Sequence, residues 1–216
     1  MTPSNDRFRE LRRLLRSYEV TGYVFDDTED RSGAALSAYL RQAAIEPSRA
    51  AEAVAEIDDL LETGLFNDAI ADDVDLLPHI HPPHGMTLED CLAVIGGHLR
   101  QFLAEPAAPS RTPPHTAWEW RERFPELSHL LGAYFHQDFS LEYSSHREAL
   151  DDYTSDTSES DLRQLADEIH EFLSLNASDQ LLKKSAATLG LSILPPKGVR
   201  LRQWLTDVRG IVLHQM

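Results

Sequence analysis

The chain contains 216 residues, of which 42% are hydrophobic, and its formal net charge is −16 at pH 7. The length suits two domains of about 100 residues each, and the apolar content is sufficient for packed cores. The negative charge argues against nucleic-acid binding, which needs clustered Lys and Arg, and no uncharged apolar run is long enough to predict a membrane span.

The same charge would attract a basic protein partner and raise its association rate. Alternatively, the acidic surface only keeps the protein dispersed. The N-terminal segment MTPSNDRFRELRRLL has no apolar signal core, so we expect no export signal. The single cysteine, Cys91, cannot form an internal disulfide, which suits a reducing cytosol. We therefore expect a cytoplasmic protein.

In chain order, the first half shows helical apolar spacing in three places. The first is an i, i+3, i+4, i+7 stripe: Leu11, Leu14, Leu15 and Tyr18. A second helix is expected from Pro47, because proline suits a first helical turn. The third stripe consists of Leu88, Cys91, Leu92, Ile95, Leu99 and Phe102.

The second half repeats this pattern. Its three apolar stripes begin at Leu127, Leu162 and Leu201, and the middle one is preceded by a Ser/Asp-rich stretch suited to N-capping. Strand-like segments are scarce; the only candidates are residues 23–25 (YVF) and 191–194 (LSIL). We predict an all-α fold with about five helices in each half.

The two halves also share sequence. PPHGMTLEDCLAVIGG (residues 82–97) and PPKGVRLRQWLTDVRG (195–210) are identical at six of sixteen positions. Three further pairs match in the same order: ELRRLLRSY with ELSHLLGAY, ALSAY with ALDDY, and EIDDLL with EIHEFL, at offsets of 112 to 116 residues. We therefore predict an internal duplication, with tandem helical domains at residues 1–104 and 121–216.

Residues 105–120 (EPAAPSRTPPHTAWEW) contain four prolines and small polar residues, which predicts an extended connector. We expect Trp118 and Trp120, at its end, to pack against the second domain or between the two.

Two groups of residues were considered as chemical sites. His79, His81 and His84 have spacings that allow a loop to hold a metal, and a metal-dependent hydrolase or metal-binding protein using them is the alternative function. Their counterparts in the second half are Ser192, Leu194 and Lys197, so the repeated fold does not require them. An incidental cluster in a solvated loop is the simpler interpretation.

The second group consists of His136, Asp138, Glu142 and His146. A His and an Asp two residues apart can orient one another for acid–base chemistry, or they can cap backbone groups where a helix ends. The sequence shows no nucleophile elbow, phosphate-binding glycine loop or cysteine pair, and Cys91 aligns with Trp204 on an apolar face. We predict no enzyme and no cofactor.

The second half resembles the immunity proteins of contact-dependent growth inhibition systems (CdiI type). The most specific segment is LLGAYFHQD (residues 130–138), supported by the Pro195–Pro196 turn and the helix containing Trp204. The resemblance covers residues 124–213, and residues 6–104 read as a diverged copy. It implies a small helical cytoplasmic domain that binds a cognate toxin domain and blocks its active site without catalysis.

Related members are thought to neutralise ribonuclease-type toxins, which need a basic surface, so the resemblance agrees with the acidic charge. We expect the toxin to contact polar and aromatic side chains of the signature and of the acidic run after it, although plain solvated charges are the simpler alternative. These candidates are Tyr134, His136, Gln137, Asp138, Glu142, Asp151, Asp152, Asp156, Glu159 and Asp161.

The first half departs from the family pattern after Tyr18, where it reads EVTGYVF in place of FHQDFSL. It keeps the apolar positions and the Pro-Pro-x-Gly turn, so we expect the same fold. The sequence leaves three interpretations of this half open: a decayed copy, a second toxin-binding face, or a scaffold for the second half.

Overall fold

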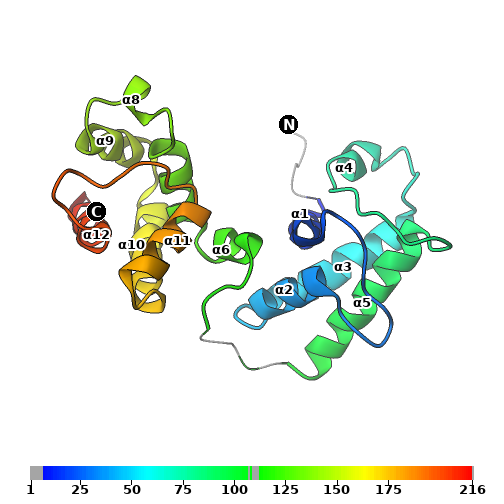
Figure 1. The fold of residues 1–216 in the computed structure, drawn as a ribbon. Coiled ribbons are helices and arrows are strands. Elements are labelled where there is room, and N and C mark those ends of the chain that lie inside the picture. The colour runs from blue at the N-terminus through cyan, green and yellow to red at the C-terminus, as the bar shows by residue number, and fades with distance from the viewer. Residues whose placement is uncertain (1–6, 107, 109–111, 216) are drawn as a thin grey trace. The chain divides into compact units, whose positions relative to one another are not determined.

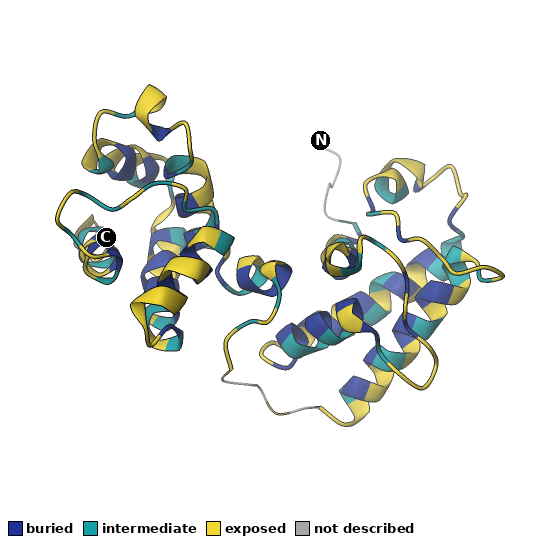
Figure 2. Cartoon of the chain, in the orientation of Figure 1, coloured by how far each residue is buried: buried dark blue, intermediate teal, exposed yellow. Residues whose placement is uncertain are grey.

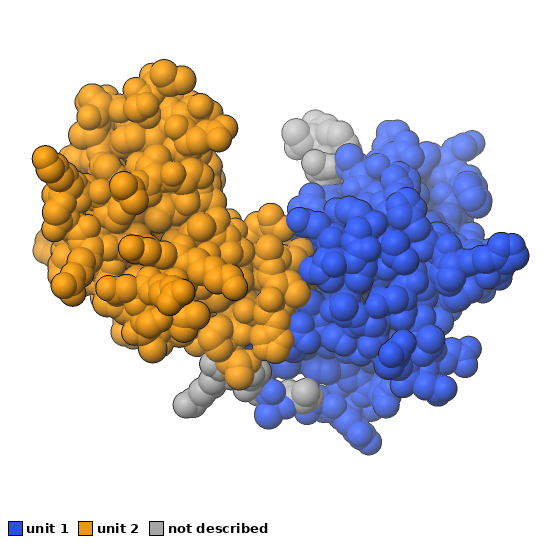
Figure 3. All heavy atoms as spheres, in the orientation of Figure 1, with its two compact units in different colours: residues 1–111 blue, residues 112–216 orange. Residues whose placement is uncertain are grey.

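The computed structural model describes residues 7–106, 108 and 112–215, and within these ranges the fold is helical with no β-strand. This confirms the all-α prediction. The chain divides into two compact units, residues 1–111 and 112–216 (Figure 3). The boundary falls within the segment that we predicted as a connector, of which residues 107 and 109–111 lie outside the described residues.

The first unit consists of five α-helices and one 3-10 helix (Figure 1). These are α1 (Arg9–Arg16), the 3-10 helix η1 (Ser17–Thr21), α2 (Ala34–Ala43), α3 (Ser48–Thr63), α4 (Ala71–Asp75) and α5 (Leu88–Ala104). The long helices α3 and α5 pack along each other, and α1 packs against α3. Their predicted apolar stripes are buried against one another.

A buried polar network connects the helices of the first unit. The carboxylate of Glu56 in α3 accepts hydrogen bonds from the backbone N–H groups of Glu10 (3.3 Å) and Leu11 (2.6 Å). It thereby satisfies N–H groups that the first turn of α1 leaves without helical partners. The carboxylate of Glu10 accepts from the Tyr39 hydroxyl (2.9 Å) and from Nε of Arg49 (2.7 Å). Glu10 is 1% exposed, so its charge is balanced inside the unit.

The second unit consists of seven α-helices and one π-helix. These are α6 (Ala117–Arg123), α7 (Pro125–His129), the π-helix η2 (Leu130–Tyr134), α8 (Phe139–Glu142), α9 (His146–Asp156), α10 (Glu159–Leu175), α11 (Asp179–Thr188) and α12 (Leu201–Gln215). This exceeds the predicted number of about five. The short helices α6 and α11 begin at hydroxyl caps, Thr116 and Ser178, which a search for long apolar stripes overlooks.

Helix α6 corrects the predicted connector, because residues 117–120 are helical rather than extended. Thr116 and Glu119 form a capping box: each side chain accepts from the backbone N–H of the other residue. The Trp120 ring then packs in the core of this unit, with ring centroids 5.6 Å from both Phe124 and Phe172. This confirms the first of the two positions expected for Trp120.

The polar network of the second unit has the same form. The carboxylate of Glu168 in α10 accepts from the backbone N–H of Leu127 at 2.8 Å, at the start of the α7–η2 segment. The Tyr153 hydroxyl in α9 donates to the carboxylate of Glu126 at 3.2 Å.

Two expected features take a different form. The apolar stripe from Leu127 to Tyr134 continues from α7 into the π-helix η2 rather than forming one regular α-helix. Here Gly190 approaches so closely that a Cβ on it would lie 2.6 Å from Cα of Gly132. The strand candidates form no strand. Instead each makes an isolated backbone contact with a segment distant in sequence: a bridge between Val24 and His81, and a hydrogen bond from the N–H of Ser192 to the Phe135 carbonyl.

Candidate functional site

Half-buried tyrosines and exposed aspartates form a patch where η2, α8 and α9 meet. Asp152 and Asp156 lie one turn apart on α9, and both are exposed. Tyr134 ends η2 and Tyr143 follows α8; their rings stack with centroids 6.1 Å apart. The Tyr143 hydroxyl donates to Oδ2 of Asp152 at 2.7 Å. We refer to Tyr134, Tyr143, Asp152 and Asp156 as the tyrosine–aspartate patch.

Both phenols of the patch have raised pKa values. The hydrogen bond to Asp152 raises the pKa of Tyr143 to about 12, with smaller contributions from burial and nearby charge. The pKa of Tyr134 is raised by burial and then by the charges of Asp152 and Asp156. The phenols therefore stay neutral at physiological pH, and the patch presents carboxylates beside aromatic faces. Such a surface suits the guanidinium or ammonium group of a basic protein.

Buried residues hold the patch in place. The ring of Tyr153, which is fully buried, meets the Tyr134 ring edge-on at a centroid distance of 5.2 Å. The ring centroid of His129 lies 6.0 Å from that of Tyr134 and 5.7 Å from that of Tyr153. Tyr134 is thus fixed by rings of α7 and α9, and its exposed face needs little ordering when a partner binds.

The polar residues at the end of the LLGAYFHQD segment (residues 130–138) form a separate polar loop with Glu142 and His146. Nδ1 of His136 accepts from the backbone N–H of Asp138 (3.1 Å), and Nε2 lies 3.4 Å from Oε2 of Glu142. Gln137 is exposed. The nitrogen Nε2 of His146 bonds the Leu194 carbonyl at 2.9 Å. This arrangement matches the capping interpretation rather than acid–base chemistry, because each histidine bonds backbone.

The remaining acidic candidates interact within their own helices. Asp151 pairs with Arg147 at 2.8 Å and Glu159 pairs with Arg163 at 2.8 Å, each across one helical turn. Asp161 accepts from the hydroxyl of Ser158, the N-cap of α10. The structure therefore does not bring these three together with the patch.

Tyr143 is the patch residue that the sequence analysis missed. It follows the signature by five residues, inside the stretch SLEYSSH, and no periodic pattern marks it. The single turn of α8 reverses the chain and returns Tyr143 to Tyr134. The only signal in the sequence was its residue type, since tyrosine is enriched at protein interfaces.

The structure does not gather the histidines into a metal site. Within the part of the chain that the structure describes, no group of three or more His, Cys, Asp or Glu side chains is placed to hold a metal ion. His81 has a backbone role: its N–H donates to the Tyr23 carbonyl at 2.7 Å, and its carbonyl accepts from the Phe25 N–H at 3.2 Å. Nothing here supports the alternative metal function.

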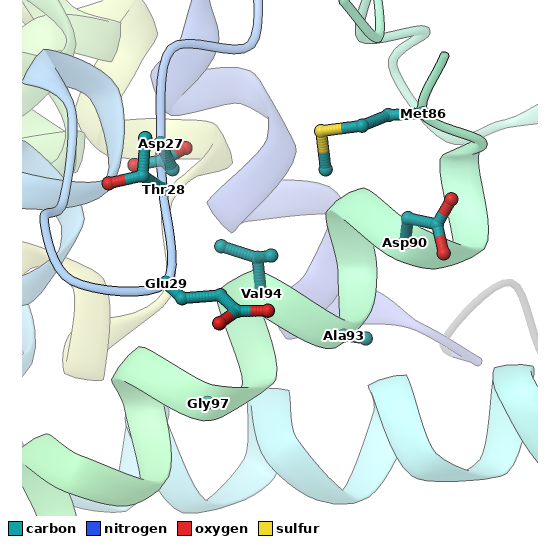
Figure 4. A pocket seen from close by; sticks show the side chains of 8 residues that line it. All are labelled: Asp27, Thr28, Glu29, Met86, Asp90, Ala93, Val94 and Gly97. Atoms are coloured by element: carbon teal, nitrogen blue, oxygen red, sulfur yellow. The ribbon is translucent and has the colours of Figure 1, made fainter.

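The first unit contains a hollow of about 690 Å³ beside α5, with Asp27, Glu29 and Asp90 on its walls (Figure 4). Asp27 accepts from the Tyr18 hydroxyl and the Gly33 N–H, and Asp90 belongs to the capping box of α5. Asp27 and Asp90 therefore have structural roles. Cys91 nearby is buried, and burial raises the pKa of its thiol to about 11, which opposes a nucleophilic role.

Comparison with known families bears on the second unit. A family model described as CdiI immunity protein matches residues 123–212, a range that includes all four patch residues. This confirms the resemblance for the second unit. No curated protein and no solved structure matches the chain. Among the described residues, no helix is long and apolar enough to cross a membrane.

Proposed function

We propose, from the match of the second unit to the CdiI immunity protein family, that this protein binds a cognate toxin domain and occludes its active site. The toxin is of the nuclease type and belongs to a contact-dependent growth inhibition or related polymorphic toxin system. The complex forms in the cytoplasm, and the protein acts by binding rather than by catalysis.

The observation that carries this proposal is the tyrosine–aspartate patch within the family-matched residues. Its carboxylates project beside two ring faces that are already fixed by buried neighbours. Protein interfaces are enriched in Tyr and Arg, and an Arg of the partner can pair with these carboxylates. A surface that is already ordered before binding loses little entropy when the partner binds. A nuclease must be basic where it holds RNA or DNA, so an acidic inhibitor is attracted to that surface.

In the first unit, a tyrosine and a glutamate together bind an arginine of the same chain. There the guanidinium of Arg49 pairs with Glu10 and lies 5.6 Å from the Tyr39 ring centroid. In the second unit, Tyr153 and Glu126 form the corresponding hydroxyl–carboxylate pair. The position 112 residues after Arg49 is aspartate, so Arg49 has no arginine counterpart at that position. This supports an arginine of the toxin as the ligand at this edge of the patch.

We also propose that the first unit is a diverged copy of the second. In both units a glutamate of a long helix, Glu56 of α3 or Glu168 of α10, accepts from the N–H of a leucine near the start of α1 or α7. In both units a buried tyrosine, Tyr39 or Tyr153, donates to a glutamate in α1 or α7. The matched positions keep the same partners as well as the same residue types.

The Pro-Pro-x-Gly turns give further support. Gly85 has a φ of +89° and Gly198 a φ of +83°, values that favour glycine. In each turn the N–H of the residue after the glycine donates to the carbonyl of the second proline, at 3.1 and 2.9 Å. The repeated sequence thus forms a repeated turn.

The proposal is tested by binding and protection. The C-terminal domain of the toxin encoded beside this gene is produced with the full chain, and complex formation and cell survival are measured. Asp152→Lys combined with Asp156→Lys is expected to weaken binding at least a hundredfold and to abolish protection. The control is Asp151→Lys combined with Glu159→Lys, which makes the same charge change on exposed residues outside the patch.

Retention of affinity by the patch variant would place the interface elsewhere. Equal losses in both variants would show that total charge, rather than the patch, controls binding. If the wild-type chain neither binds nor protects, the proposed function itself is wrong.

A further inference from the structure

An apolar groove of about 270 Å³ lies in the first unit between α3, α5 and the segment that contains α4. Leu15, Leu60 and Leu92 form its floor, and each is at most 2% exposed. Phe66 forms part of its wall and is 95% exposed. Helix α4 buries none of its residues, as its colouring in Figure 2 indicates. A phenylalanine so fully exposed beside an apolar groove is typical of an interaction site.

Negative charge dominates the stretch that supplies most of the groove's lining; only Leu15 comes from the arginine-rich helix α1. Residues 50–99 contain eleven Asp or Glu and not one Lys or Arg. Asp75 and Glu89 line the groove itself, while Asp72 and Asp73 lie on the adjacent α4. No salt bridge among the described residues involves any of these four carboxylates, whereas several acidic residues of α3 are paired, as Asp59 is with Arg7.

The second unit differs at the matching place, between its two longest helices. There α11 covers the core with Leu182 and Ala186, both fully buried. Residues 176–200 contain four Lys or Arg and one Asp, whereas residues 64–87 contain four Asp and no Lys or Arg. The open groove and its acidic border are therefore particular to the first unit.

We infer that this groove binds a basic polypeptide segment that inserts a large apolar side chain beside Phe66. The apolar floor and Phe66 provide burial for the inserted side chain, and the border of unpaired carboxylates attracts Lys and Arg on either side of it. A second copy of this chain is a poor occupant, because two molecules of net charge −16 repel each other. The inference does not rest on the proposed function, since the patch lies in the other unit.

The test uses the full chain and a fluorescein-labelled amphipathic peptide of sixteen residues, with Lys and Arg on one face and Leu and one Trp on the other. Binding is measured by fluorescence anisotropy at low and at physiological salt. Two control peptides replace the Leu and Trp by Ser, or the basic residues by Glu. Both controls are expected to bind at least tenfold more weakly than the parent peptide.

Two groove variants are compared with matched variants in the second unit. Phe66→Ser is compared with Leu194→Ser, because Leu194 is also largely exposed (83%) but lies outside the groove. Asp72→Asn with Asp75→Asn is compared with Asp167→Asn with Asp207→Asn, which changes the total charge equally. Each groove variant is expected to bind the parent peptide at least tenfold more weakly, and each control within twofold of the wild type.

Equal affinity in groove and control variants would overturn the inference. So would concentration-dependent self-association, measured by sedimentation, that Phe66→Ser abolishes, because the groove would then be an interface between copies. The variant Asp152→Lys/Asp156→Lys is expected to bind the peptide at no less than half the wild-type affinity, so failure of the toxin proposal and failure of this one are distinguishable.

Discussion

Glu168 is expected to make the second unit more stable at acidic than at neutral pH. Its carboxyl is 6% exposed and accepts from the Leu127 N–H and from Nε2 of Gln164, both at 2.8 Å. Burial raises its pKa from 4.5 to about 7, although these hydrogen bonds oppose the shift. The folded state therefore binds the proton more tightly than the unfolded state. The resulting stability is fully present below about pH 4.5 and is lost as the pH rises through 7.

The size of the effect follows from the shift. A difference between 4.5 and about 7 in pKa corresponds to roughly 3 kcal/mol between the two protonation states. Between pH 5 and pH 8 the free energy of unfolding of the second unit should fall by roughly 2 to 3 kcal/mol from this group alone. Glu168→Gln removes the charge and keeps an oxygen acceptor for the Leu127 N–H, so this part of the pH dependence should disappear.

The assay is urea unfolding of the full chain at pH 5, 6, 7 and 8, followed by tryptophan fluorescence. All three tryptophans, Trp118, Trp120 and Trp204, belong to the second unit, so the signal reports that unit alone. The control variant is Glu159→Gln, an exposed glutamate on the same helix. Its pH dependence should equal that of the wild type. Parallel curves for Glu168→Gln and the wild type would refute the reasoning, because the buried carboxyl would then not titrate in this range.

Four further predictions concern packing and burial. Gly190→Ala should destabilise the second unit by more than about 2 kcal/mol, because its φ is +107° and a Cβ would lie 2.6 Å from a backbone Cα of η2. Gly210→Ala, whose Cβ meets nothing within 4 Å in α12, should stabilise that unit by roughly 0.5–1 kcal/mol, and tryptophan-monitored unfolding measures both. The buried thiol of Cys91, with its pKa raised to about 11, should react with a disulfide reagent at pH 8 only after unfolding; prompt reaction of the native protein would contradict its burial. Arg49→Ala should destabilise the first unit by about 1–3 kcal/mol, because the buried Glu10 carboxylate loses its nearer cationic partner and keeps Arg13, at 3.4 Å; circular dichroism would show this as a transition that tryptophan fluorescence does not follow.

The helices were predictable where apolar residues recur at helical spacing. The stripes beginning at Leu11, Leu88, Leu162 and Leu201 all form helices, because burying one face of a long helix depends mainly on local spacing. The short helices were missed for the opposite reason. Helix α6 depends on one capping box and α8 is a single turn, so neither has a periodic pattern to detect.

The candidate site was predictable in region but not in its members. Asp151 and Asp152 are adjacent residues of the same type, but Asp152 bonds Tyr143 whereas Asp151 pairs with Arg147. This difference depends on the rotation of α9 about its axis, which its buried residues Ala149 and Tyr153 fix. Tyr143 joins the patch through the chain reversal at α8, a tertiary feature that its sequence neighbours do not encode. The acidic run thus contains Asp152 and Asp156 of the patch together with residues that interact only within their own helices.

Substitutions at buried and at exposed residues differ in their effect on stability, and this difference supports both proposals. Removing one partner of the Tyr39–Glu10 or Tyr153–Glu126 pair leaves a polar group unsatisfied and costs about 1–3 kcal/mol, so stability alone favours keeping both partners of each pair. Exposed charges change stability by only about 0.5 kcal/mol each, so folding alone does not determine them. Stability therefore gives no reason for residues 64–87 to carry only acidic charges while residues 176–200 carry mainly basic ones. A difference in binding partner does give a reason, and this is why the patch and the groove are assigned to separate ligands on a shared framework.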